Sequence, residues 1–90
     1  MKLTHEKLGS WEVESPLKNR HCEAFWEYIM EHNPKGHSGA YSNRIMIEAA
    51  NEAGILKAPF DANEGDPKAV YWLASAIVDY VTEAQTIDPN

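Results

Sequence analysis

The sequence predicts a mainly α fold, a compact bundle of three helices that follows an extended N-terminal arm. The chain has 90 residues, of which 43% are hydrophobic and 10% aromatic, enough for one packed core at this length. Three segments repeat apolar residues at helical spacing between Pro- and Gly-containing breaks. We place helices at about residues 16–32, 40–53 and 67–85. Residues 1–14 form the arm, and residues 15–90 form a single domain.

Residues 1–14 lack a helical pattern, because Gly9 interrupts them and apolar and acidic residues alternate from Trp11 onward. This alternation predicts an extended segment that lays Trp11 and Val13 on the helical body. A lone short strand is not stable without a partner. We therefore expect a sheet here only if another chain supplies the second strand.

The first helix is expected to begin at Ser15 and Pro16, a hydroxyl N-cap followed by a proline at the first helical position. One broad face of this helix carries the residues expected in the core: Leu17, His21, Phe25, Tyr28, Ile29 and His32. Another face carries Arg20 and an acidic row. Trp26 and Met30 lie on a flank that the core would leave uncovered, so the arm or a second protein is expected to cover them.

The second helix is expected to be capped by Ser38 or Ser42. Its apolar face is rich in alanine, which allows close helix packing: Tyr41, Ile45, Met46, Ala49, Ala50 and Ala53. Gly54 suits the left-handed position that ends a helix, and Ile55 suits the hydrophobic contact that follows it. In the next loop, Phe60 is expected to fold back onto the core.

The third helix has the strongest signals and should be the centre of the bundle. Asp66 supplies an N-cap oxygen, Pro67 suits the first position, and Pro89 prevents continuation at the end of the chain. Its core face is expected to contain Val70, Leu73, Ala74, Ile77, Val81 and Ala84. Trp72 points to the opposite, polar side. It is either an exposed binding residue or is covered by a loop or an end of the chain.

Composition restricts the class of partner. The formal net charge of −6 argues against binding nucleic-acid phosphates, which needs clustered Lys and Arg. Cys22 is the single cysteine, so no intrachain disulfide is expected and nothing indicates an oxidising compartment. No apolar run is as long as a membrane span, and no signal-peptide pattern appears in the first ten residues. We expect a cytoplasmic protein that binds another protein, not nucleic acid or a membrane.

Catalytic and metal-binding patterns are weak. Adjacent His21 and Cys22 point about 100° apart on a helix and form neither a ligand pair nor a nucleophile–base pair. The loop 61–66 departs from a calcium loop, because glycine stands fifth instead of sixth and Trp72 takes the place of the bidentate glutamate. We expect no metal, no cofactor and no enzymatic activity. The alternative is a small metal-dependent or thiol enzyme that uses Cys22, His21, His32 or His37.

The candidate binding residues fall into two groups. The apolar group consists of Trp72, Trp26 and Met30. The acidic group is the row Glu23, Glu27 and Glu31, whose i,i+4 spacing costs a few tenths of a kcal/mol per pair through repulsion. Such a row is either a solvated face or a docking stripe for a basic partner. A domain with two apolar patches is also able to self-associate.

Three segments carry a resemblance to a known group of proteins. They are Ser-Pro-Leu-Lys at 15–18 leading to Glu-Ala-Phe at 23–25, the alanine-rich segment 47–55 that ends in Ala-Gly-Ile, and Tyr-Trp-Leu-Ala at 71–74 running on to 86–90. In order and spacing they resemble small phage and prophage proteins that act as tail assembly chaperones. The resemblance implies a small helical protein that binds the tape measure protein and assists tail tube assembly without catalysis. It covers neither the arm nor any specific functional residue.

A second hypothesis is a phage-encoded inhibitor of a host defence complex. Such a protein would present Glu23, Glu27 and Glu31, with Glu12 and Glu14, to a basic nucleic-acid site. Charge reversal of the row would then matter more than loss of Trp72, and the tail assembly hypothesis predicts the opposite order.

Overall fold

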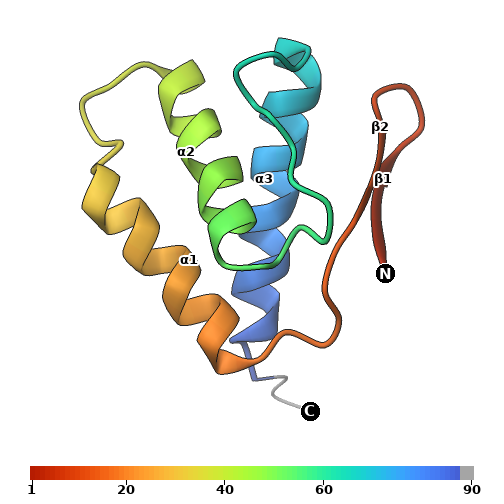
Figure 1. The fold of residues 1–90 in the computed structure, drawn as a ribbon, viewed down its shortest axis with the longest axis vertical. Coiled ribbons are helices and arrows are strands. Elements are labelled where there is room, and N and C mark those ends of the chain that lie inside the picture. The colour runs from red at the N-terminus through yellow and green to blue at the C-terminus, as the bar shows by residue number, and fades with distance from the viewer. Residues whose placement is uncertain (88–90) are drawn as a thin grey trace.

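The computed structural model describes residues 1–87 as three helices and one β-hairpin (Figure 1). The elements are β1 (Lys2–His5), β2 (Gly9–Glu12), α1 (Asn19–His32), α2 (Gly39–Glu52) and α3 (Pro67–Ala84). α2 packs against both α1 and α3. The hairpin lies beside α3, away from α1 (Figure 1). The expected effect of Pro89 falls outside the described residues.

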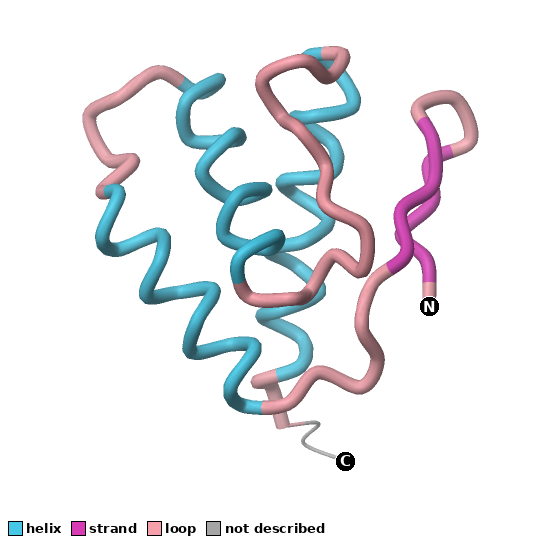
Figure 2. Tube along the Cα trace, viewed as in Figure 1, coloured by secondary structure: helices cyan, strands magenta, loops and turns pink. Residues whose placement is uncertain are grey.

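The N-terminal arm is a hairpin, so the expectation that a sheet needs a second chain is wrong. β1 and β2 pair antiparallel, from Lys2 opposite Glu12 to His5 opposite Gly9 (Figure 2). The turn at residues 6–8 lacks the Asn-Gly signal of common hairpins. Instead, Nδ1 of His5 accepts the backbone N–H groups of Lys7 and Leu8, at 3.0 and 3.2 Å.

The chain after β2 also pairs with the loop that follows α2. Val13 forms an isolated antiparallel bridge with Leu56, and the N–H of Glu14 donates to the carbonyl of Ile55. Val13 and Ile55 are fully buried. This bridge therefore joins the hairpin to the helical core through both backbone and side chains.

The core lies between the three helices, and Val13, in the chain after β2, packs against it. Its largest fully buried side chains are Phe25, Ile45, Ile47, Ile55, Leu73, Ile77, Val13 and Val81. Complete burial of such a side chain contributes about 1.5–3 kcal/mol. The predicted core face of α3 is confirmed except at Ala84, which lies exposed in the last turn.

α1 begins three residues later than predicted. The Ser15–Pro16 peptide bond is cis and neither residue caps the helix. The N-cap is Lys18, whose backbone N–H donates to Nδ1 of His21 at 2.9 Å. An imidazole at the third helical position thus does what Glu or Gln does in a capping box.

The buried face of α1 centres on Cys22 and Phe25. His21 is buried as predicted, but Cys22 is buried as well, although the predicted face did not include it. His32, predicted for that face, is exposed. The face is therefore rotated from the predicted one toward Cys22.

α2 begins and ends as its caps predict. The Ser38 side chain accepts the Tyr41 N–H at 3.1 Å, and Gly54 adopts a φ of 74°. The prediction missed Ile47, which is fully buried. A single apolar stripe does not describe this helix, because α2 is covered by α1 on one side and α3 on the other.

The loop between α2 and α3 is held by side-chain hydrogen bonds to its backbone. The Asn51 side chain donates to the carbonyl of Phe60 at 2.9 Å and accepts its N–H at 3.1 Å. Phe60 is half-buried against the core, as predicted. At the end of the loop, Asp66 accepts the Lys68 N–H at 3.0 Å, which confirms the predicted cap of α3.

Candidate functional site

The outward side of α1 presents the acidic row to solvent. Glu23, Glu27 and Glu31 are all exposed. Within residues 1–87 none of them forms an ion pair, since the two ion pairs there use Glu12 and Glu48. No ion pair in this part of the chain offsets the repulsion that their spacing creates, and on α1 only Arg20, three residues before Glu23, places a positive charge near the row.

Met30 lies beside this row and is 78% exposed. On a helical wheel it falls about 20° from Glu23, so the thioether and the carboxylates share one surface. We call Glu23, Glu27, Met30 and Glu31 the α1 outer face. It combines an exposed apolar side chain with three unpaired carboxylates.

Trp26, the other residue predicted on this flank, is partly covered by the protein itself. Its ring packs edge-on against Phe25, with centroids 4.9 Å apart. Its indole N–H donates to Oε1 of Gln85 at 2.7 Å. The residue just after α3 therefore covers part of Trp26, and Met30 is the more accessible of the two.

Trp72 is half-buried under the N-terminal hairpin. Its ring stacks on Trp11 at a centroid distance of 5.9 Å and meets the edge of His5 at 5.3 Å. Trp11 in turn meets Phe60 at 5.9 Å. Of the two alternatives that the sequence left open, covering by an end of the chain is the one observed. The neighbouring Tyr71, 64% exposed, was not among the predicted residues.

The hairpin register explains why Trp72 is covered. Leu3 lies opposite Trp11, and His5 is two residues from Leu3, so all three side chains leave the same face of the hairpin. This face packs on α3. The aromatic residues were visible in the sequence, but their alignment depends on strand pairing that the sequence pattern did not reveal.

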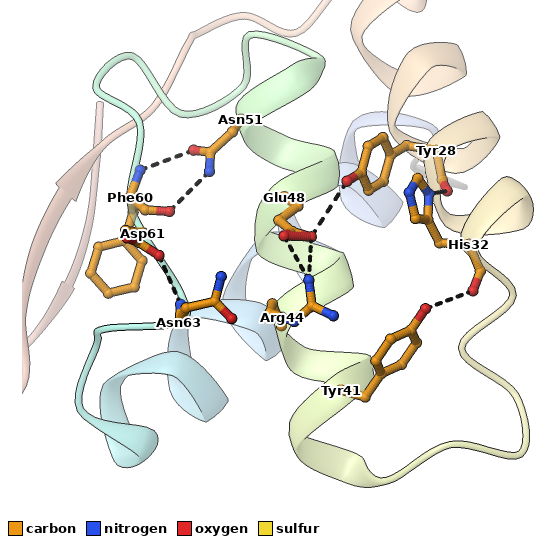
Figure 3. A network of polar contacts seen from close by, with 9 residues as sticks. All are labelled: Tyr28, His32, Tyr41, Arg44, Glu48, Asn51, Phe60, Asp61 and Asn63. Carbon is orange, nitrogen blue, oxygen red and sulfur yellow. Dashed lines mark hydrogen bonds and ion pairs between the residues drawn. The ribbon is translucent and has the colours of Figure 1, made fainter.

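A polar network joins α1 to α2 (Figure 3). One terminal nitrogen of Arg44 donates to both carboxylate oxygens of Glu48, at 2.8 and 3.0 Å. The Tyr28 hydroxyl donates to the same carboxylate at 3.4 Å. Burial, and secondarily the charge of Glu48, raises the pKa of Tyr28 above its ordinary value. The side chains hold one another, and the network lacks a nucleophile paired with a base.

Aromatic stacking extends the network toward the loop between α1 and α2. Tyr28 stacks on His32 at 4.0 Å, and His37 stacks on Tyr41 at 4.2 Å. The Tyr41 hydroxyl donates to the carbonyl of His32 at 3.1 Å (Figure 3). These contacts fix the positions of both histidines by packing against tyrosines.

The candidate metal ligands do not converge. Nδ1 of buried His21 accepts the Lys18 N–H, and Cys22 is buried in the core. Across residues 1–87, no three His, Cys, Asp or Glu side chains lie close enough together to hold a metal ion. Asp61 and Asp66 in the next loop accept backbone N–H groups, in keeping with a turn and a helix cap.

A groove lies between the N-terminal halves of α2 and α3. Its volume is about 600 Å³, within the usual range for ligand sites. Tyr41 and Arg44 line it from α2, and Val70 and Tyr71 line it from α3. None of the predicted binding residues lines this groove. A signal that could have indicated it is the pair of tyrosines near two helix starts, of which Tyr41 is half-buried and Tyr71 exposed.

Comparison of the chain with protein-family models, curated proteins and solved structures finds no match. Among the described residues, no helix is long and apolar enough to cross a membrane.

Proposed function

We propose that this protein is a non-enzymatic protein-binding module whose α1 outer face binds a basic partner. The observation that carries the proposal is the exposure of Met30 beside three carboxylates that have no ion-pair partner within residues 1–87. No other exposed methionine or aromatic residue of the described chain lies within such a row.

The chemistry of the face supports this function. Lysine or arginine side chains of a partner would relieve the repulsion within the row, and complementary charge accelerates and orients association. Met30 adds a flexible apolar contact that adapts to different surfaces. Trp72 contributes less than the sequence suggested, because Trp11 and His5 cover it.

The biological role that we propose first is tail assembly chaperone, with a tape measure protein as the partner. It rests on the resemblance of the three sequence segments described above. The second candidate is an inhibitor of a host defence complex, and the three unpaired carboxylates favour it. Their regular spacing allows them to occupy a basic site that otherwise binds nucleic-acid phosphates.

A binding experiment tests the proposal and separates the two roles. The tagged protein is mixed with phage tail tube and tape measure proteins, or with a host defence complex, and bound protein is quantified. Replacing Glu23, Glu27 and Glu31 with Gln should lower capture of the true partner by about tenfold or more, as expected for several lost charge pairs. Met30→Ala should lower it less. The control is a Gln triple, a variant in which Glu6, Glu64 and Glu83 are replaced with Gln, because it changes the net charge by the same amount as the α1 variant.

The control triple should leave capture unchanged. Enrichment of a tape measure or tube protein supports the chaperone role, and enrichment of the defence complex supports the inhibitor role. If neither class is captured, or if the α1 triple binds as the wild type does, the proposed function is wrong.

A further inference from the structure

The groove between α2 and α3 is chemically different from the rest of this acidic protein. Its lining contains one charged side chain, Arg44, and no carboxylate, although the chain has a net charge of −6. Val70 and Pro67 supply apolar surface, and Tyr41 and Tyr71 supply aromatic rings. The groove therefore suits a ligand that is apolar in its body and negative at one point.

Arg44 is held in a defined position in this groove. The guanidinium lies 5.1 Å from the centre of the Tyr41 ring and is anchored on Glu48 through one terminal nitrogen. Within residues 1–87, its other nitrogens have no hydrogen-bond acceptor among the protein atoms. A guanidinium carries five N–H donors in a rigid fork that suits a carboxylate. Because the side chain is already ordered, binding costs little of its conformational entropy.

A second hollow lies next to the groove, along the same two helices. The hollow has a volume of about 270 Å³, and Asn43 lines both spaces. Asn63 also lines the first, so two carboxamides are placed to bond the N–H and C=O groups of an extended chain. Asp79 lines the far hollow and supplies a negative charge there.

Helix geometry relates the groove to the second hollow. Tyr71, which lines the groove with Arg44, and Asp79, which lines the hollow, are eight residues apart on α3, about 12 Å at 1.5 Å per residue. An extended polypeptide covers that distance in about four residues. A ligand whose negative end lies in the groove beside Tyr71 and Arg44 should thus carry a positive charge about four residues away, near Asp79.

We propose that this groove binds the C-terminal end of a polypeptide. The free carboxylate lies at the Arg44 guanidinium, the apolar last side chain lies against Val70 and Tyr71, and a Lys or Arg about four residues upstream lies at Asp79. The site is formed by α2 and α3 and is separate from the α1 outer face. It can therefore be tested independently of the proposed function.

Synthetic pentapeptides test this proposal. The set is fluorescein-Lys-Ala-Ala-Ala-X, where X is Leu, Ile, Val, Met, Phe, Tyr or Trp, and each peptide is made with a free and with an amidated C-terminus. Dissociation constants are measured by fluorescence polarisation with protein concentrations up to ~1 mM. The weakest binding detected in this way has a free energy of about −4 kcal/mol. At least one free peptide should bind about tenfold more tightly than its amide, the effect expected for a charge-assisted hydrogen bond. Replacing the Lys of that free peptide with Glu should also weaken its binding, because Glu would lie near Asp79.

Two variants place the binding in the groove. Gly39 lines the groove, and a Cβ added there meets no atom within 4 Å, so Gly39→Phe should fill the groove without disturbing the fold. The double change Arg44→Gln with Glu48→Gln removes the charge and keeps a polar pair. Both should lower affinity about tenfold, and the double variant should abolish the preference for a free carboxylate. Thermal unfolding by circular dichroism confirms that each variant is folded.

Specific outcomes overturn the proposal. These are no binding by any free peptide, equal affinity for free and amidated peptides, or an unchanged carboxylate preference in the folded double variant. The Gln triple at Glu23, Glu27 and Glu31 is the matched control and should bind the peptides as the wild type does. Loss of peptide binding in that triple would assign the contact to α1 and also overturn the proposal.

Discussion

Tyr28 is a residue whose hydrogen bond to Glu48 affects both its own pKa and the stability of the fold. Its hydroxyl is the only group of α1 that donates to Glu48, and Glu48 also anchors Arg44 (Figure 3). The ring stacks on His32. Ionisation of the phenol would place a second negative charge beside Glu48, which explains the direction of the pKa shift.

The raised pKa of Tyr28 makes a prediction about alkaline stability. Above about pH 10, where an unperturbed tyrosine ionises, the unfolded chain loses the Tyr28 proton while the folded chain keeps it. Stability from this group is therefore fully present below pH 10 and falls as the pH rises through the folded-state pKa. Tyr28→Phe should flatten this fall and cost about 0.5 kcal/mol at pH 7, for one long hydrogen bond.

Urea unfolding at pH 7 and near pH 10.5 measures both effects of this substitution. Tyr71→Phe is the control, because Tyr71 is exposed and has no side-chain hydrogen bond within the described residues. Equal alkaline losses in wild type and Tyr28→Phe would contradict the assignment.

The start of α3 is an element whose stability depends on one carboxylate. Asp66 accepts the Lys68 N–H, and Pro67 leaves no N–H to satisfy at the first position. Asp66→Ala should lower the free energy of unfolding by about 0.5–2 kcal/mol. Asp66→Asn should recover most of the loss, since an amide oxygen also caps. Thermal unfolding of the two variants checks this, and equal stability of Ala and wild type would refute it.

The N-terminal hairpin acts as a cover whose main contact is Trp11. This ring lies between Trp72 and Phe60. Trp11→Ala should destabilise the protein by about 2 kcal/mol, less than a fully buried Trp, and should expose Trp72 to water. A red-shifted tryptophan emission in folded protein is the expected signal.

Leu8→Ala, at the tip of the hairpin, is the matched control for Trp11→Ala, because Leu8 makes none of these aromatic contacts. If Trp11→Ala leaves the emission of the remaining tryptophans unchanged, the hairpin is not what shields Trp72.

At the scale of the whole molecule, the sequence predicted features that depend on residues close together in the chain better than features that depend on residues far apart in it. The cap and core face of α3 follow from residues within a few turns of each other, and both are confirmed apart from Ala84. The hairpin was missed, because its turn uses the His5 side chain and the residue that follows it, Val13, pairs with distant Leu56. The start of α1 was missed for a different reason, because its cap is local but uses His21, three residues after Lys18, where Glu or Gln would be the recognised residue.

The candidate site divides in the same way. The exposure of Met30 and of the acidic row follows from the helical wheel, and α1 shows it. The shielding of Trp72 depends on how a distant hairpin packs, and the groove depends on how two helix starts meet the loop before α3. Neither is encoded in a local pattern, so the sequence left the exposure of Trp72 open and did not identify Arg44 as a groove residue.

The net charge of −6 acts on the whole fold and gives the last prediction. The molecule measures 38 × 31 × 23 Å, comparable to the Debye length of about 30 Å at 0.01 M salt but much larger than the length of about 10 Å at 0.1 M. At low salt, carboxylates on opposite sides of the fold therefore repel one another. At 0.1 M salt, repulsion remains mainly between neighbouring carboxylates. The pairs Glu23–Glu27 and Glu27–Glu31 should together cost about 0.4–1 kcal/mol at low salt.

Replacing all three with Gln should raise the stability at ~0.01 M salt by this amount and reduce its dependence on salt. The Gln triple at Glu6, Glu64 and Glu83 changes the net charge equally, from −6 to −3, but it removes one acidic i,i+4 pair, Asp79–Glu83, instead of two, so it should gain less. Urea unfolding of the three proteins across salt concentrations measures the difference. If both triples gain equally, overall charge and not the spacing of the row governs the effect, and the row is no more strained than any other acidic surface. A larger gain for the α1 triple would instead show that the row costs stability in the isolated protein, which a basic partner would recover on binding.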